Sequence, residues 1–252
     1  MVTRHAVVLL PGIVLPAEPA YAALLDALGD RVDAVAKELE VYAGDTPPPG
    51  YGLGLEVDGV LREADARGFG RFHLVGYSAG GAASLVFAAA HADRLLSLAL
   101  LEPAWAGNER TPEEEAVMES FRALAELPPD QALAGFQRLQ LAPGVDPPPP
   151  PPGPPPVWMG KRPAGIRAAL EAFDESDLDL AALRAFDRPV YIALGGRSNP
   201  DYFARMAERL AALLPDVAIE TFPDRHHFDP PHRIEPERLA QSLLAVWQRA
   251  ES

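Results

Sequence analysis

Short apolar runs that alternate with helical patterns constrain the fold of this chain more than any other feature. The runs lie at 5–10, 71–75, 95–101, 189–194 and 217–222, and they have the length and composition of buried strands. Helical patterns lie between or after them, at 20–28, 55–67, 79–91, 201–214 and 235–248. Strands that alternate with helices build a parallel sheet with helices on both faces. The sequence therefore predicts an α/β fold with a mostly parallel, doubly wound sheet.

Residues 103–186 interrupt this alternation. They contain helical patterns only, at 112–127, 130–141, 165–173 and 178–186. Eleven residues at 147–157 are almost all proline, which favours polyproline II and is typical of a stiff surface linker. We therefore expect a core made of residues 1–102 and 187–252, with 103–186 inserted as a helical cap that carries the polyproline tract.

Composition and charge exclude several classes of function. The 252 residues carry 36 acidic and 22 basic side chains, a net charge of −14, which disfavours binding to nucleic acid or anionic membranes. The absence of cysteine excludes disulfides, thiolate metal sites and a cysteine nucleophile. The N-terminal apolar run is too short to span a bilayer and ends at Pro11-Gly12, so we interpret it as a strand rather than a signal peptide. We expect a cytoplasmic protein that acts on a small molecule.

The pattern Gly-x-Ser-x-Gly occurs once, centred on Ser78, where a strand pattern runs into a small-residue helix. A sharp turn of this kind strains the serine backbone and leaves almost no room beside it, which glycine at both flanks accommodates. The turn presents the Ser78 hydroxyl at the carboxyl end of the sheet. The backbone N–H of Ala79, at the start of the helix, is then free to donate to an oxyanion. The sequence predicts Ser78 as a nucleophile.

At this point the chain resembles the α/β-hydrolase superfamily over nearly its whole length. The resemblance rests on five segments in order: HAVVLLPG, HLVGYSAGG, LALLEPAW, VYIALGGRSNP and ETFPDRHHFDPP. It implies serine-dependent acyl transfer without a metal or cofactor, and a triad in the order serine, acid, histidine. Two departures stand out. The family's first two strands are expected to be missing, and Pro11-Gly12 stands where members often have His-Gly. The resemblance still implies Ile13, or else Val14, as the second oxyanion-hole donor.

The resemblance places the catalytic base in the loop after the last strand. His226 and His227 both lie there, and the family's histidine position coincides with His227. His226 then remains a surface histidine or a partner that supports His227. We expect His232 to be solvated, and we assign no role to the other three histidines, His5, His73 and His91.

The acid has more than one candidate. The family most often places an aspartate after the strand before the last, but here Ser198 and Asn199 occupy the expected position. Asp201 follows closely, although a carboxylate in the first turn of a helix has an ordinary role in complementing the helix dipole. Some members use an acid directly after the preceding strand, where this chain has Glu102. We favour Glu102 over Asp201, with a neutral or absent acid as the third possibility.

The resemblance implies a serine hydrolase that cleaves a carboxylic ester or thioester of a small to medium hydrophobic substrate through an acyl-enzyme on Ser78. We expect Tyr77 and Trp105 to contribute to the substrate pocket. Alternatives are a carbon–carbon bond-cleaving enzyme, a lyase, cyclase or transacylase, or a catalytically silent binding protein. The shortened sheet leaves an edge that a second copy would cover, which favours a homodimer.

Overall fold

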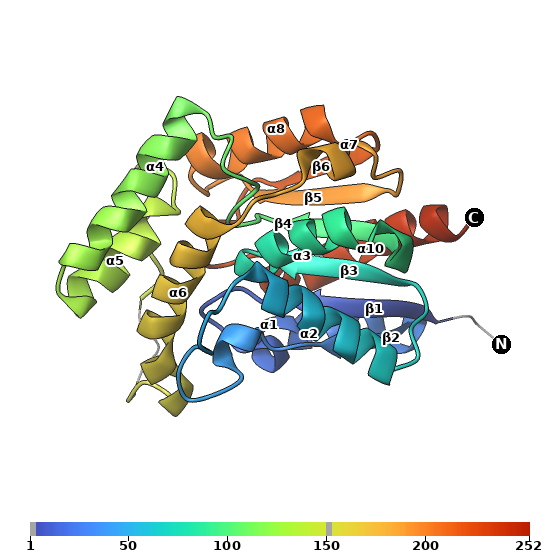
Figure 1. The fold of residues 1–252 in the computed structure, drawn as a ribbon, viewed down its shortest axis with the longest axis horizontal. Helices are drawn as coiled ribbons and strands as arrows, with labels where there is room; N and C mark the ends of the chain where they lie inside the picture. The colour runs from blue at the N-terminus through green and yellow to red at the C-terminus, as the bar shows by residue number, and fades with distance from the viewer. Residues whose placement is uncertain (1–3, 150–152) are drawn as a thin grey trace.

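The computed structural model describes residues 4–149 and 153–252, and its strands form a single sheet (Figure 1). In the described residues six strands pair in the order β2-β1-β3-β4-β5-β6, and every pair is parallel. Their bounds are β1 His5–Leu10, β2 Val32–Ala36, β3 Phe72–Tyr77, β4 Leu95–Leu101, β5 Val190–Gly195 and β6 Val217–Phe222. The predicted α/β fold is confirmed. A homodimer across a sheet edge stays a prediction.

Alternating residues of the strands face two separate layers of helices. In β1, Val7 and Leu9 pack with α1 (Ala17–Leu28) and α10 (Pro236–Glu251), whereas Val8 and Leu10 pack into the opposite layer. That opposite layer contains α2 (Leu53–Ala66), α3 (Ala79–Ala90) and α8 (Arg205–Leu213). A sheet covered on both faces requires strands that are apolar on both sides, which explains why the apolar runs are continuous.

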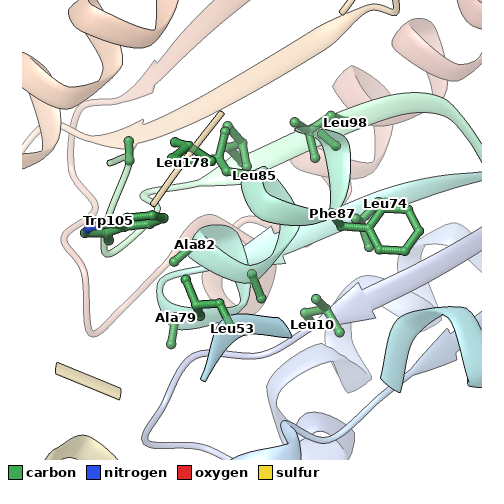
Figure 2. Close-up of a cluster of buried hydrophobic side chains, with 14 of the residues drawn as sticks. Leu10, Leu53, Leu74, Ala79, Ala82, Leu85, Phe87, Leu98, Trp105 and Leu178 are labelled. Atoms are coloured by element: carbon green, nitrogen blue, oxygen red, sulfur yellow. The ribbon is translucent and has the colours of Figure 1, made fainter. Parts of the chain in front are cut away.

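Helix α3 packs closely on the middle of the sheet because its residues are small. Ala79 and Ala82 lie at its first turn and Leu85 and Phe87 further along, with Leu74 of β3 among their neighbours in the buried cluster (Figure 2). Small side chains let the helix start directly at the end of β3. This fixes the position of Ser78, the residue between the two elements.

The described part of the long connection from β4 to β5 contains four α-helices, and three of them stand at the carboxyl edge of the sheet (Figure 1). These three are α4 (Pro112–Ala123), α5 (Pro129–Leu139) and α6 (Arg162–Glu175). Bidentate hydrogen bonds from Arg122 to Asp174, at 2.8 and 2.9 Å, join α4 to α6. The fourth helix, α7 (Leu180–Arg184), packs against α3 instead. Residues 150–152 of the proline tract lie outside the described residues.

The strand order changes direction between β1 and β3, since β1 pairs with β2 on one side and β3 on the other. In a parallel sheet of this type, the loops at the carboxyl ends of the two strands diverge there and leave a crevice. Ile13 follows β1 and Ser78 follows β3, so both lie at this crevice. Among the described residues, no helix has the length and apolar character needed to cross a membrane.

Candidate active site

Ser78 lies in a strained turn between β3 and α3. Its φ is 53° and its ψ −117°, a left-handed conformation that side-chain-bearing residues rarely adopt. The neighbouring glycines are required by packing: a Cβ on Gly76 would lie 2.4 Å from the carbonyl oxygen of Gly80, and one on Gly80 would lie 2.5 Å from that of Leu10. The turn aims the Ser78 hydroxyl at the loop that follows β6.

The His227 side chain connects Ser78 to Glu102. Its Nε2 lies 3.0 Å from Ser78 Oγ, and its Nδ1 lies 3.0 Å from Glu102 Oε2. The three residues are 5%, 2% and 3% exposed for Ser78, His227 and Glu102, so water is almost excluded from the chain of hydrogen bonds. A carboxylate, an imidazole and a hydroxyl in this order can transfer a proton away from the hydroxyl.

Glu102 is fixed from two strands. It directly follows β4 with a φ of 47°, and its backbone N–H donates to the carbonyl oxygen of Ala193 in β5 at 3.1 Å. Its Oε1 accepts a hydrogen bond from the backbone N–H of Gly195 at 2.7 Å, which leaves Oε2 for His227. Each carboxylate oxygen therefore has a donor, as a buried charge requires.

The other acid candidates point elsewhere. The Asp201 carboxylate is 63% exposed and pairs with Arg205 at 3.8 Å. Asn199 caps the following turn, since its Oδ1 accepts from the Asp201 N–H at 3.0 Å, and its Nδ2 donates to the carbonyl oxygen of Leu139. Ser198 is buried, but its hydroxyl has no hydrogen-bond partner among the described residues. Glu102 is the carboxylate that the structure brings to His227.

Ile13 and Ala79, whose backbone N–H groups are the oxyanion donors expected from the sequence, both line the cavity at the serine. Val14 does not belong to this lining. The loop that carries Ile13 is anchored by Tyr42, whose hydroxyl donates to the Ile13 carbonyl oxygen at 2.7 Å. Burial raises the pKa of Tyr42 to about 12, so the hydroxyl keeps its proton for this bond. Gly12 permits the approach, because a Cβ there would lie 2.7 Å from the Tyr77 ring.

A model of the alpha/beta hydrolase family matches residues 7–242. The chain belongs to the alpha/beta hydrolase family. No curated protein sequence matches it. Among solved structures, a thermophilic esterase from Thermogutta terrifontis has 21% identity and a TM-score of 0.72, covering 99% of this chain and 92% of the esterase.

Two further structures have the same alpha/beta hydrolase fold. The carboxylesterase CesB from Bacillus subtilis has 17% identity and a TM-score of 0.66, over 96% of this chain and 83% of its own. A meta-cleavage product hydrolase from Pseudomonas fluorescens has 15% identity and a TM-score of 0.65, over 98% of this chain and 91% of its own. At such identities the likeness shows the fold alone.

The imidazole of this hydrolase is held in place by aromatic neighbours. The Phe203 ring stacks on His227 with centroids 4.5 Å apart and planes inclined by 15°. The centre of the Tyr77 ring lies 5.0 Å from that of the imidazole, and the Tyr77 hydroxyl donates to the His227 carbonyl oxygen. Burial, together with the nearby Glu102 charge, raises the pKa of Tyr77 well above its usual value, so Tyr77 stays a donor. Tyr77 therefore contacts His227 and is not part of the cavity lining expected from the sequence.

Trp105 differs from its predicted role in the substrate pocket. Its side chain is 1% exposed and forms part of the buried cluster beside α3 (Figure 2). The indole stacks on Phe173 at 6.0 Å and donates to Asn108 Oδ1 at 2.9 Å. Phe173, and not Trp105, lines the cavity at Ser78, so Trp105 lies one layer behind it.

His226 and His232, the two histidines near His227 in the chain, are both buried. His226 is buried, and its Nδ1 lies 3.1 and 3.2 Å from the backbone N–H groups of Phe228 and Asp229, which tightens the loop. His232, expected in solvent, is fully buried between the rings of Tyr21 and Tyr77. The expectation fails because the short helix α9 (Pro231–Ile234) turns this side chain inward.

A cavity of about 30 Å³ lies against Ser78. A buried water needs roughly 10–15 Å³, so this space admits only a small group. Its lining consists of Ile13, Ser78, Ala79, Ala104, Phe121, Phe136, Gln140, Ile166, Ala169, Leu170, Phe173 and Tyr202.

Several of these residues, and two that support the site, were not expected from the sequence. Tyr42 lies in a segment that fits helix or strand, and Phe203 lies in the π-helical turn Pro200–Ala204 before α8. Gln140, directly after α5, and Tyr202, in the same turn as Phe203, also line the cavity. These contacts arise from tertiary packing, so no local sequence pattern marks the residues that make them.

Proposed function

We propose that this alpha/beta hydrolase is a serine hydrolase, cleaving a carboxylic ester or thioester of a hydrophobic substrate through an acyl-enzyme on Ser78. The observation that carries the proposal is the buried chain Ser78–His227–Glu102, with both contacts at 3.0 Å. A hydroxyl is a weak nucleophile until a base takes its proton, and the imidazole is placed to do so.

Acylation starts when Ser78 Oγ attacks the substrate carbonyl and His227 Nε2 takes the hydroxyl proton. The charge that develops on the carbonyl oxygen is stabilised by the N–H groups of Ile13 and Ala79. Glu102 stabilises the imidazolium and fixes the proton on Nδ1. The imidazolium then gives its proton to the departing alkoxide or thiolate, and the acyl group stays on Ser78.

Deacylation repeats these steps with water. His227 takes a proton from the water, the hydroxide adds to the acyl carbonyl, and the tetrahedral intermediate forms in the same oxyanion hole. Its collapse releases a carboxylic acid and returns the proton to Ser78 Oγ. Every step uses residues of this chain, and the arrangement of donors is the same for both halves of the reaction.

A fluorophosphonate probe tests the proposal, because it reacts only with an activated serine. We expect stoichiometric labelling located at Ser78 by peptide mass spectrometry, and none in Ser78→Ala. The variant Ser120→Ala, on the exposed face of α4, is the matched control and should label as the natural protein does. A folded protein that does not label would contradict the proposal and favour the silent binding protein. Labelling without turnover of simple esters would favour the carbon–carbon bond-cleaving or transferase alternatives.

A further inference from the structure

A second, much larger cavity of about 550 Å³ lies among the inserted helices α4, α5 and α6. Ligand pockets for small molecules typically have volumes of roughly 300–1,000 Å³, so it has the size of a binding site. Its wall is mainly aliphatic and aromatic, and includes Leu124 at the end of α4, Leu133 of α5 and Met159 before α6. We refer to this cavity as the cap groove.

The cap groove adjoins the small cavity at Ser78. Phe121 of α4, Phe136 of α5, and Ile166 and Leu170 of α6 line both spaces. These four apolar side chains come from all three inserted helices. The wall that the two spaces share is therefore apolar.

The two spaces differ strongly in volume, at about 30 Å³ against Ser78 and about 550 Å³ in the cap groove. The inner cavity fits the reacting carbonyl and a small group on one side of it. A large group on the other side has to lie in the cap groove. The geometry thus favours esters that are small on one side of the scissile bond and extended on the other.

Five of the fifteen residues that line the cap groove are charged, namely Arg122, Arg162, Arg167, Glu171 and Asp174. The ion pair of Arg122 and Asp174 closes the groove where α4 meets α6, and both side chains are more than a third exposed. The Arg162 guanidinium lies 3.7 Å from the centre of the Tyr42 ring, and Arg167 and Glu171 are exposed. The other ten lining residues are apolar, so an apolar chain is the chemistry that most of the wall matches.

From the shared apolar wall and the difference in volume we propose that the cap groove binds an extended apolar chain of the ester or thioester substrate. The inference rests on the proposed hydrolase function and adds the substrate class to it. The chain belongs either to the acyl group or to the alcohol or thiol group, and the experiment separates the two.

Two series of activated esters test the substrate class. In one series the acyl chain is lengthened from acetyl to decanoyl on a p-nitrophenyl leaving group. In the other, acetate esters carry alcohols of increasing length. We expect kcat/KM to rise by about two- to fourfold per methylene in one of the series, the effect of burying a methylene. Values that stay flat or fall with chain length in both series would overturn the inference.

A pair of variants on α5 shows whether the groove itself is responsible. Ala132 lines the cap groove, whereas Ala134, two residues along the same helix, is exposed and outside the lining. In the series that responds to chain length, we compare kcat/KM for the member with an eight-carbon chain with kcat/KM for the shortest member. Ala132→Phe should lower this long-to-short ratio at least tenfold. Ala134→Phe adds the same bulk outside the groove and should leave the ratio at its natural value. Equal ratios in the two variants would contradict the assignment.

Binding to the Ser78→Ala protein separates this inference from the proposed function. A fluorescent long-chain fatty acid should bind Ser78→Ala saturably, and adding Ala132→Phe should weaken the binding at least tenfold. Such binding in a protein whose natural form does not label with fluorophosphonate would keep the groove and remove the hydrolase. Labelling at Ser78 without any chain binding or chain-length dependence would keep the hydrolase and remove the groove assignment.

Discussion

The carboxylate of Glu102 accepts one hydrogen bond from His227 Nδ1 at 3.0 Å and another from the backbone N–H of Gly195 at 2.7 Å. Glu102 directly follows β4 and Gly195 is the last residue of β5, so the acid after one strand is held by the end of the next. The family's usual aspartate is expected after β5, but this chain has the neutral side chains of Ser198 and Asn199 there. The end of β5 instead supplies the backbone N–H of Gly195 to the Glu102 carboxylate. The neutral residues after β5 and the glutamate after β4 are thus two parts of a single arrangement.

Replacing Glu102 by glutamine should lower kcat for an activated ester by a factor of about 10³ to 10⁴. The amide keeps the size of the side chain but removes its charge and presents the wrong partner to the His227 Nδ1–H. Asp201→Asn is the matched control, because that carboxylate is exposed and pairs with Arg205, and its kcat should be unchanged. Steady-state kinetics of both proteins decides; a full rate in Glu102→Gln would show that Glu102 is not the acid.

Tyr77→Phe should slow the reaction about tenfold with little change in KM. The hydroxyl of Tyr77 donates to the carbonyl oxygen of His227, and its loss frees the loop that carries the imidazole. A hydrogen bond of this kind contributes roughly 1 kcal/mol, and misplacement of the base adds to the effect on the rate. Fluorophosphonate labelling rates at Ser78 measure it directly. A higher KM with an unchanged kcat would indicate that Tyr77 contacts substrate instead.

Two glycine substitutions should change stability in opposite directions. In Gly80→Ala the new methyl group would lie 2.5 and 2.6 Å from the carbonyl oxygens of Leu10 and Pro11, so we expect a loss of at least about 2 kcal/mol. Gly54→Ala lies on the exposed side of α2 with no atom within 4 Å, and should add about 0.5–1 kcal/mol. Urea unfolding followed by circular dichroism measures both. If alanine is tolerated at position 80, the loop after β1 lies further from the turn that carries Ser78.

The buried imidazole of His232 should make the protein sensitive to acid. Burial lowers the pKa of His232 to about 3, whereas in the unfolded chain it titrates near its ordinary value of about 6.5. Its contribution to stability is therefore complete above about pH 6.5 and is lost as the pH falls toward 3. Between pH 7 and pH 4.5 this loss amounts to about 3 kcal/mol.

His232→Phe removes this effect. Neither ring nitrogen of His232 has a hydrogen-bond partner among the described residues, and the phenyl ring fits between two tyrosine rings. The variant should be at least as stable as the natural protein at pH 7 and more stable by about 3 kcal/mol at pH 4.5. Urea unfolding at the two pH values gives the comparison, in which other titrating groups cancel. Parallel losses in the two proteins would place His232 in contact with solvent.

Much of the fold is predictable from the sequence because its signals are local. The apolar runs at β1, β3, β4, β5 and β6 and the glycines around Ser78 specify strands and a tight turn by composition and spacing alone. The pattern of residues 31–42, which contain β2, can be drawn as helix or strand, and from sequence we favour a strand near the start or the end of the segment. Its pairing with β1 settles the choice, and that contact is tertiary.

The site is only partly predictable for the same reason. Glu102 and Asp201 are both plausible in sequence, and only the side-by-side placement of β4 and β5 shows which carboxylate reaches His227. Trp105 is close to Glu102 in the chain but lies behind Phe173, and His232 turns inward because α9 packs against α1. The direction of a side chain relative to a distant element leaves no mark in the spacing of residues.

Ser78 and Glu102 share an unusual backbone state, since they are the two residues other than glycine with positive φ among the described part of the chain. They end adjacent strands, and each costs roughly 1–3 kcal/mol that glycine would not. Laboratory selection for heat resistance alone would therefore reward glycine at both positions and discard the nucleophile and the acid together. Any programme to make this hydrolase more robust has to screen turnover in every round, because at these two positions robustness and chemistry oppose each other.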